Sequence, residues 1–250
     1  MKQLALISTA LFLAACGGGG DDSTATPAPA PSPTTTSTAE GMWTGTTSTG
    51  YQANLVILEN GETWGIYSSS NYVVGAVYGN TSSTSTALSG TGSLFNLVSR
   101  TVGNASYSGT YAVKSSISVS VSDGTKFTGA YSSLYDQAAS LATLAGTYTG
   151  WAVTGGTAAQ TTAVNIDANG SVSSSYVSGT YVCTTSGKAT PRNTAKNVFN
   201  LQLSFSGNAC ALGNGSTVTG VATYDSAAKR LIAMGLNAAK SDGFIYLASR

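Results

Sequence analysis

The sequence predicts an all-β protein built from two tandem, small, antiparallel β-barrels of the up-and-down kind, after a disordered tether. Apolar and polar residues alternate with period two, most clearly in residues 117–121 and 199–205, which is typical of half-buried strands. Only residues 137–144 fit a short turn of helix. Turn signals suited to tight type I′ hairpins separate the expected strands: Asn60-Gly61, Asp123-Gly124, Asn169-Gly170, Asn214-Gly215 and Asp242-Gly243.

The composition excludes several classes of function. The chain has 250 residues, with 11 basic and 10 acidic side chains, a net charge of +1 and no His. Without a basic run, we expect no nucleic-acid partner, because such binding depends on contacts between cations and phosphates. Without His, neither a Ser-His-Asp triad nor a His-ligated zinc site can form. We therefore expect no cofactor, no metal and no catalytic residues of those kinds.

Residues 1–15 have the features of a secretory signal, with Lys2 ahead of an apolar stretch too short to span a bilayer. The stretch ends in Leu13-Ala14-Ala15-Cys16, which resembles the lipobox of bacterial lipoproteins. The resemblance implies cleavage between Ala15 and Cys16 and lipid attachment to Cys16, so the expected partner there is a membrane. By analogy with enterobacterial lipoproteins, Gly17 in place of Asp implies the outer membrane, with its periplasmic or cell-surface face left open.

Residues 16–40 are expected to form a flexible tether. Four glycines follow Cys16, and Pro27, Pro29, Pro31 and Pro33 then alternate with small residues. Such alternation favours extended polyproline II structure at ~3.1 Å per residue. The tether therefore serves to space the folded part away from the membrane.

An internal repeat divides the folded part into residues 41–140 and 145–250. Gly41-Met42-Trp43 opens the first copy and Gly146-Thr147-Tyr148 the second, and each is followed by an apolar strand and Asn-Gly. A third match pairs residues 128–136 with residues 219–225. Each copy has room for about seven or eight strands of ordinary length, and closure into a barrel hides the sheet edges. One composite barrel made from both halves is the alternative.

Two cysteines remain after Cys16 is assigned to the lipid. Cys183 and Cys210 both lie in the second copy, and an exported chain meets an oxidising compartment. We expect a structural disulfide between them, since neither a Cys-x-x-Cys spacing nor a His supports redox or nucleophilic chemistry.

Paired carboxylates are the remaining route to an enzyme. Glu59 and Glu62 flank the Asn60-Gly61 turn, and glycoside hydrolysis would need two carboxyl groups in a cleft. A solvated hairpin tip is a poor place for such a pair. We therefore expect a protein that is not an enzyme.

The candidate binding surface combines aromatic and basic residues. Tyr67, Tyr72 and Tyr78 lie close together in the first copy, and clustered surface tyrosines favour binding. Arg192 and Lys196 lie in the only mildly basic loop, between the two cysteines. Strand packing is the structural alternative for the tyrosines.

A lipobox, a Gly-rich tether and two β-rich repeats resemble uncharacterised proteobacterial lipoproteins and, more distantly, surface lipoproteins such as transferrin-binding protein B and factor-H-binding protein. The resemblance implies a non-enzymatic binding or structural module at the outer membrane. The alternatives are a lipocalin-like periplasmic carrier of a small apolar ligand and a periplasmic inhibitor or immunity protein. The partner, a protein or a small molecule, stays unidentified, because fold likeness does not settle function.

Overall fold

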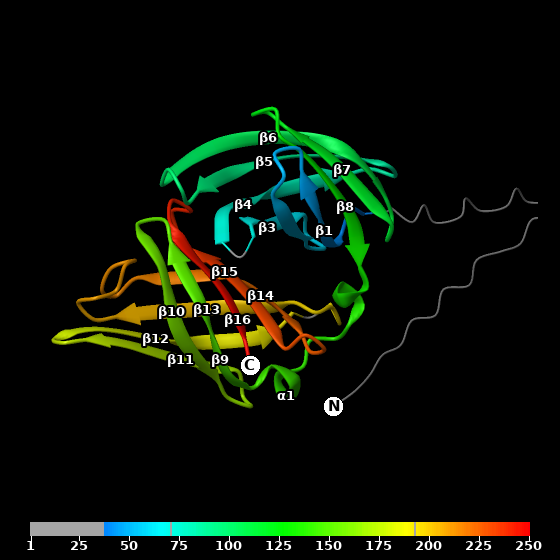
Figure 1. The fold of residues 1–250 in the computed structure, drawn as a ribbon. Helices are drawn as coiled ribbons and strands as arrows, with labels where there is room; N and C mark the ends of the chain where they lie inside the picture. The colour runs from blue at the N-terminus through cyan, green and yellow to red at the C-terminus, as the bar shows by residue number, and fades with distance from the viewer. Residues whose placement is uncertain (1–37, 71, 193) are drawn as a thin grey trace, which may run out of the picture. The chain divides into compact units, whose positions relative to one another are not determined.

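The computed structural model describes residues 38–70, 72–192 and 194–250. The lipobox, Ala15, Cys16 and nearly all of the expected tether lie outside the described residues. The described chain forms two closed, eight-stranded antiparallel barrels, one after the other (Figure 1). This confirms the predicted fold class and rules out the single composite barrel.

The first barrel is an up-and-down meander in which β1 closes the sheet by pairing with β8. Its strands alternate buried and exposed residues, as at Ile117 and Val119, because one face of the closed sheet lines the interior. The strands are β1 (Gly41–Thr47), β2 (Gln52–Ile57), β3 (Glu62–Ser69), β4 (Tyr72–Ser83), β5 (Ala87–Asn96), β6 (Thr101–Ala112), β7 (Ser116–Val121) and β8 (Lys126–Ser132).

The second barrel repeats this topology, with β16 pairing with β9. The alternation predicted at residues 199–205 places Phe199, Leu201 and Leu203 in its interior. The strands are β9 (Gly146–Thr154), β10 (Thr157–Ile166), β11 (Ser171–Ser178), β12 (Tyr181–Pro191), β13 (Phe199–Ser206), β14 (Thr217–Asp225), β15 (Arg230–Leu236) and β16 (Gly243–Ser249).

Two short helices connect the barrels: η1 (Ser133–Asp136), a 3-10 turn, and α1 (Leu141–Leu144), one turn of α-helix within the predicted region. Across the part of the chain that the structure describes, no helix is long and apolar enough to cross a membrane.

All five predicted turn signals lie in hairpins, but the predicted turn type is wrong at each of them, because φ is not positive at Asn60, Asp123, Asn169, Asn214 or Asp242. A type I′ turn needs positive φ at both central residues, whereas φ is positive at Gly61 (83°) and not at Asn60. The loop between β2 and β3 is longer than a two-residue turn: Gly61 N–H donates to Leu58 O, and Leu58 N–H to Glu62 O. The Asn60 side-chain oxygen accepts the Glu62 N–H at 3.0 Å, which holds the turn locally.

Two of the three repeat matches fall on equivalent strands, and the third does not. Trp43 on β1 and Tyr148 on β9 are both fully buried at the start of the first strand of their barrels. Residues 128–136, however, belong to β8 and η1, and residues 219–225 belong to β14, the sixth strand of its barrel. The third match was therefore a coincidence of abundant Gly and Thr, although two repeats exist.

Both barrels belong to one compact unit, and an apolar cluster joins their outer faces. Trp64 on β3 is 2% exposed and Met234 on β15 is 6% exposed, although neither faces a barrel interior. This double burial explains why β3 and β15 have long buried runs instead of clean alternation. The cluster contains Met42, Val56, Leu58, Trp64, Ile66, Ala76, Phe95 and Tyr135 with Val153, Val198, Val221, Met234, Leu236 and Ile245.

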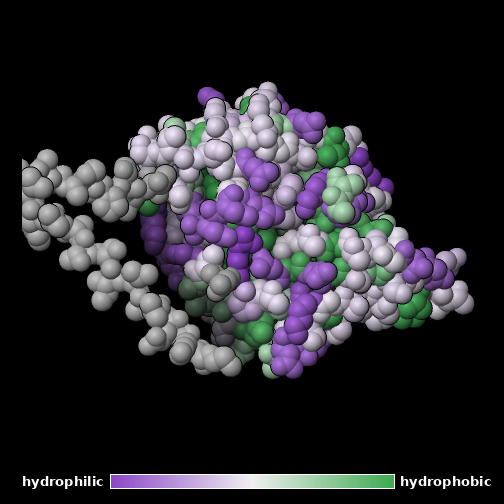
Figure 2. Space-filling model, turned by 180° about the vertical axis from the view of Figure 1, so that it is seen from behind, coloured by the Kyte–Doolittle hydropathy of each residue, from purple (hydrophilic) through white to green (hydrophobic). Residues whose placement is uncertain are grey.

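The outer surface reflects the low charge of the sequence. On the face shown in Figure 2, pale residues of near-zero hydropathy are interspersed with hydrophilic residues and small hydrophobic groups. Only 8% of the residues are charged, which agrees with this mixed surface.

Candidate ligand-binding lumen in the first barrel

The two barrels differ in the size of the side chains that point inward. The interior of the second barrel holds Tyr148, Phe199, Leu203 and Tyr246, all at most 5% exposed, in one continuous cluster. Along β3 to β6 of the first barrel, the inward face instead holds several small residues. The register aligns Gly65 with Val77, Gly79 with Gly92 and Gly92 with Ala105, so all of these residues share the inward face. Gly65, Gly92 and Ala105 border unfilled space, although a Cβ added at Gly65, Gly79 or Gly92 would meet neighbouring atoms within 3 Å.

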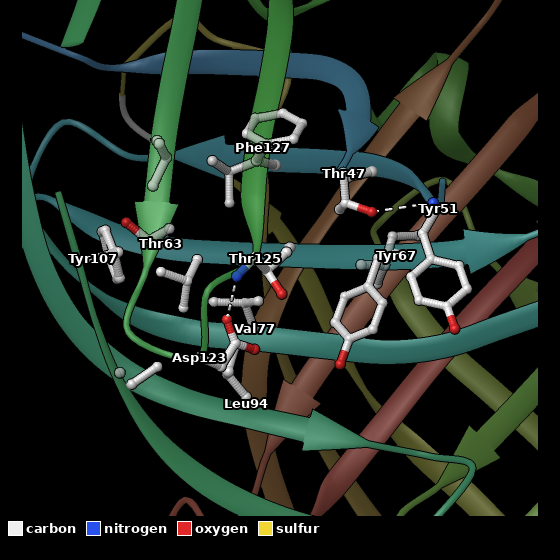
Figure 3. Close-up of a pocket in the computed structure, with 18 of the residues that line it drawn as sticks. Thr47, Tyr51, Thr63, Tyr67, Val77, Leu94, Tyr107, Asp123, Thr125 and Phe127 are labelled. Atoms are coloured by element: carbon white, nitrogen blue, oxygen red, sulfur yellow. Dashed lines mark hydrogen bonds between the residues drawn. The ribbon is translucent and has the colours of Figure 1, made fainter. Parts of the chain in front are cut away.

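That space is a cavity of about 250 Å³ inside the first barrel. Figure 3 shows Val77, Leu94 and Phe127 pointing toward it from strands on several sides. The volume is slightly below the ~300–1,000 Å³ range of ordinary ligand pockets. The apolar part of its lining includes Ala53, Leu55, Ile57, Val77, Leu88, Leu94, Ala105, Val119, Val121 and Phe127.

A second apolar cluster closes the end of the lumen where β1 begins. Trp43 is fully buried there with Tyr111 and Ile117, and its ring packs edge-on against Tyr131 at 5.4 Å. The Trp43 indole N–H donates to Ala39 O at 3.1 Å, so its polar atom is satisfied. The cavity therefore has a solid floor.

A chain of hydroxyl groups crosses the wall near this floor. Thr63 Oγ1 donates to Gly61 O at 3.0 Å, so its 2.6 Å contact with Thr81 Oγ1 must be a hydrogen bond donated by Thr81. The 2.9 Å contact between Thr81 Oγ1 and the Tyr107 hydroxyl must in turn be donated by Tyr107. Each of the three hydroxyl protons is therefore donated in a hydrogen bond within the protein, and these hydroxyl groups can only accept hydrogen bonds from a ligand.

The opposite end of the lumen is the mouth, which we define by Tyr51, Tyr67, Asn96 and Asp123. The rings of Tyr51 and Tyr67 lie 5.9 Å apart, and the Asp123 carboxylate accepts the Thr125 N–H at 2.8 Å (Figure 3). Burial, followed by the negative charge of Asp123, raises the pKa of Tyr67 above its ordinary value. Tyr67 is therefore a neutral phenol at physiological pH.

The structure does not bring the three predicted tyrosines together. Tyr67 points into the lumen, whereas Tyr72 is 73% exposed at the start of β4. Tyr78 lies on the outer face, where its ring centre is 4.6 Å from that of Trp64. The Lys240 ammonium lies 4.8 Å from the ring centre of Tyr78. Only Tyr67 belongs to the cavity.

Both predicted basic residues form ion pairs: Arg192 pairs with Glu59 in the β2–β3 loop of the first barrel, and Lys196 pairs with Asp136 in the connecting turn η1. Arg192 Nη2 lies 2.7 Å from Glu59 Oε1, and Lys196 Nζ lies 2.8 Å from Asp136 Oδ1. Burial raises the pKa of Glu59, but its hydrogen bond to Arg192 helps bring the net pKa below the ordinary value. The charges of Arg192 and Lys196 are thus engaged within the protein, which leaves them poorly placed as a contact surface.

Cys183 on β12 and Cys210 in the β13–β14 loop form a disulfide in the second barrel. Among the described residues there is no group of three or more His, Cys, Asp or Glu side chains that could hold a metal ion.

Sequence reasoning missed the lumen, with Tyr51 and Asp123 at its mouth. Glycines recur in strands of the first copy, and glycine inside a strand marks close approach or missing side-chain volume. Here they mark close approach, because a Cβ at Gly75 or Gly90 would meet the ring of Tyr67 or Tyr107, and one at Gly79 or Gly92 would meet neighbouring backbone. The glycine pattern therefore does not predict the lumen.

The fold and the site thus define a two-barrel protein in which the first barrel is hollow and the second is filled. No protein-family model and no curated protein matches the chain.

Among solved structures, the chain is similar to transferrin-binding protein B. A single mutant of that vaccine antigen from Haemophilus parasuis gives a TM-score of 0.29 at 9% identity, with 80% of this chain and 65% of that chain covered. An intact transferrin-binding protein B with N and C lobes gives 0.28 at 8% identity, covering 80% and 66%. A protein of unknown function from Nostoc punctiforme gives 0.22 at 11% identity, covering 85% and 96%. The likeness is distant, and no ligand, partner or activity is carried over from it.

Proposed function

We propose that the protein is a non-enzymatic binding protein whose first barrel holds a small, mainly apolar ligand. The observation that carries the proposal is the contrast between a cavity of about 250 Å³ in the first barrel and a continuous side-chain core in the second. An apolar cavity with a closed floor and one mouth removes a ligand's surface from water, which is the main source of affinity for such molecules.

The cavity sets the size of the ligand. An engineered apolar cavity of ~150 Å³ binds benzene, so a cavity of about 250 Å³ takes about ten non-hydrogen atoms in proportion. At about 0.5 kcal/mol per atom, within the range observed for small ligands, the binding free energy is about 5 kcal/mol. That corresponds to a Kd on the order of 0.2 mM.

The test is calorimetric titration of the full chain with phenylbutanol, a neutral probe of this size. Ala105→Phe places a ring in the lumen and should abolish binding, since Ala105 lines the cavity. Ser106→Phe places the same ring on the exposed outer face of the same strand and should leave binding unchanged. Absence of binding by the unmodified chain, or equal effects of the two variants, would overturn the proposal.

The non-enzymatic part of the proposal is supported by the positions of the two carboxylates considered for hydrolysis. Glu59 is held by Arg192, and Glu62 accepts the Trp64 indole N–H at 3.1 Å. Both carboxylates have structural partners outside the lumen.

The proposed location is the outer membrane, through lipid on Cys16. The test is metabolic labelling with palmitate, in which the unmodified chain should incorporate label and Cys16→Ser should not. Label in both chains, or in neither, would contradict lipid attachment at Cys16.

A second candidate function is a contact with a macromolecule through the β11–β12 hairpin. Val177 is 63% exposed and Tyr181 is 60% exposed on this hairpin, and exposed large apolar residues are typical of interaction sites when they cluster. A photo-crosslinking residue at position 181 should give an adduct in intact cells that is missing when the crosslinker replaces Ser118, which is exposed on the first barrel. Equal yields at the two positions would argue against this contact.

A further inference from the structure

We infer that the ligand of the first barrel carries a positively charged, hydrogen-bond-donating end, such as an amine, which lies at the mouth against Asp123. The inference rests on the proposed function and adds the chemical class of the ligand to it. The observation behind it is the chemistry of the lumen: its charge is negative, and the hydroxyl groups of Thr63, Thr81 and Tyr107 near its floor offer only acceptor lone pairs.

The charge of the lumen comes from a single group. Of the residues that line the cavity, Asp123 is the only one with a charged side chain. In the described part of the chain, no basic side chain lies within ion-pair distance of its carboxylate. Lys126 points to the outer face, because the adjacent Phe127 points inward. Arg100, in the β5–β6 loop, donates instead to Gly156 O in the second barrel at 3.3 Å.

Three hydroxyl groups near the floor of the lumen also offer only acceptors to a ligand. In the chain formed by Thr63, Thr81 and Tyr107, each hydroxyl proton is donated to a partner within the protein. A ligand donor can therefore find partners at both ends of the cavity, whereas a ligand carboxylate meets the like charge of Asp123 at the mouth.

The two mouth tyrosines favour the same kind of ligand. The faces of Tyr rings attract cations, and the Tyr51 and Tyr67 rings lie together at the mouth beside Asp123 (Figure 3). A carboxylate with two neighbouring tyrosine rings offers an ammonium group both an ion pair and aromatic faces. The apolar part of the ligand would then occupy the space between Val77, Leu94 and the rest of the wall.

The experiment compares three probes with the same apolar body, phenylbutylamine, phenylbutanol and 5-phenylpentanoate, titrated into the full chain at low ionic strength. The amine should bind about fivefold more tightly than the alcohol, the upper end of what a partly exposed ion pair supplies. Added salt should reduce this preference through screening. The carboxylate should bind more weakly than the alcohol.

Asp123→Asn tests the residue itself. The amide oxygen can still accept the Thr125 N–H, so the turn is retained, while the charge is lost. The variant should bind amine and alcohol about equally, with alcohol affinity unchanged. The control is Asp225→Asn, a matched turn-capping carboxylate in the second barrel that accepts the Ala227 and Ala228 N–H groups; it should keep the amine preference.

The outcomes separate the two levels of the proposal. If no probe binds, the proposed function fails. If phenylbutanol binds and the amine does not bind more tightly, or if Asp123→Asn keeps the preference, only the inference about the cationic end is overturned.

Discussion

A pair of matched substitutions tests the difference between the two barrels through stability alone. Ala105 lines the cavity of the first barrel, and Ala222 is 2% exposed in the filled core of the second. Replacing each by Leu adds three carbon atoms. In the first barrel the added atoms enter empty space, and their burial is worth about 2.4 kcal/mol at ~0.8 kcal/mol per carbon.

Ordering the Leu side chain costs about 0.5–1 kcal/mol, so Ala105→Leu should stabilise the protein by about 1.5 kcal/mol. For a protein of this size, that corresponds to a rise in Tm of about 3–6 °C. Ala222→Leu should instead destabilise by about 1–3 kcal/mol, because added atoms in a packed core force side chains off their rotamers.

The assay is guanidinium unfolding of the two variants and the unmodified chain, with the midpoint compared at constant slope. Opposite shifts of the midpoint are expected. Destabilisation by both substitutions would refute the reasoning, because it would mean that the first barrel is as tightly packed as the second.

Three further predictions concern the scaffold. Replacing Cys183 and Cys210 together by Ser should lower the free energy of unfolding by about 3.5 kcal/mol in the chain-entropy description, since the disulfide spans 27 residues. Unfolding with and without reductant checks this, and an unchanged free energy of unfolding would contradict it. Trp64→Ala should lower the free energy of unfolding by about 3–5 kcal/mol, because the indole is buried between the barrels. Calorimetry should then show separate melting of the two barrels. An unchanged single transition would argue against the shared core. Hydrogen bonds from Lys196 and then Lys114 lower the pKa of Asp136 from 3.8 to about 2. Since the folded pKa lies below the unfolded one, this stabilisation is present above about pH 4 and is lost as the pH falls through about 2. Asp136→Asn should lower the free energy of unfolding by about 1 kcal/mol at pH 7, after allowance for solvent screening, and by little at pH 2. Equal losses of stability at both pH values would be inconsistent with this.

Much of the fold could be predicted from local sequence signals. The alternation at residues 117–121 and 199–205 reports which face of a strand is buried, and it became β7 and β13. The repeated openings at Trp43 and Tyr148 marked the start of each barrel because a large side chain is buried at the same place in both. These signals are local, and the physics behind them acts within a few residues.

The candidate site could not be predicted in the same way. Tyr67 and Tyr78 differ by register alone: one points into the lumen and the other to the interface between barrels, and only the pairing of β3 with β4 decides which. Asp123 looked like one more turn residue, because its role at the mouth depends on strands from the whole barrel closing around it. Likewise, Arg192 and Glu59 are 133 residues apart in sequence, and no local pattern indicates their ion pair.

Methyl NMR of the full chain, labelled at Ile, Leu and Val, during titration with butylbenzene, a neutral apolar probe, shows directly whether the first barrel holds a ligand. We expect chemical-shift changes at the methyl groups that line the first barrel, such as Leu55, Val77 and Val121. We expect none at Leu201 or Leu203 in the second barrel, whose interior is filled. Changes confined to the second barrel, or none in either barrel at millimolar probe, would contradict ligand binding in the first barrel.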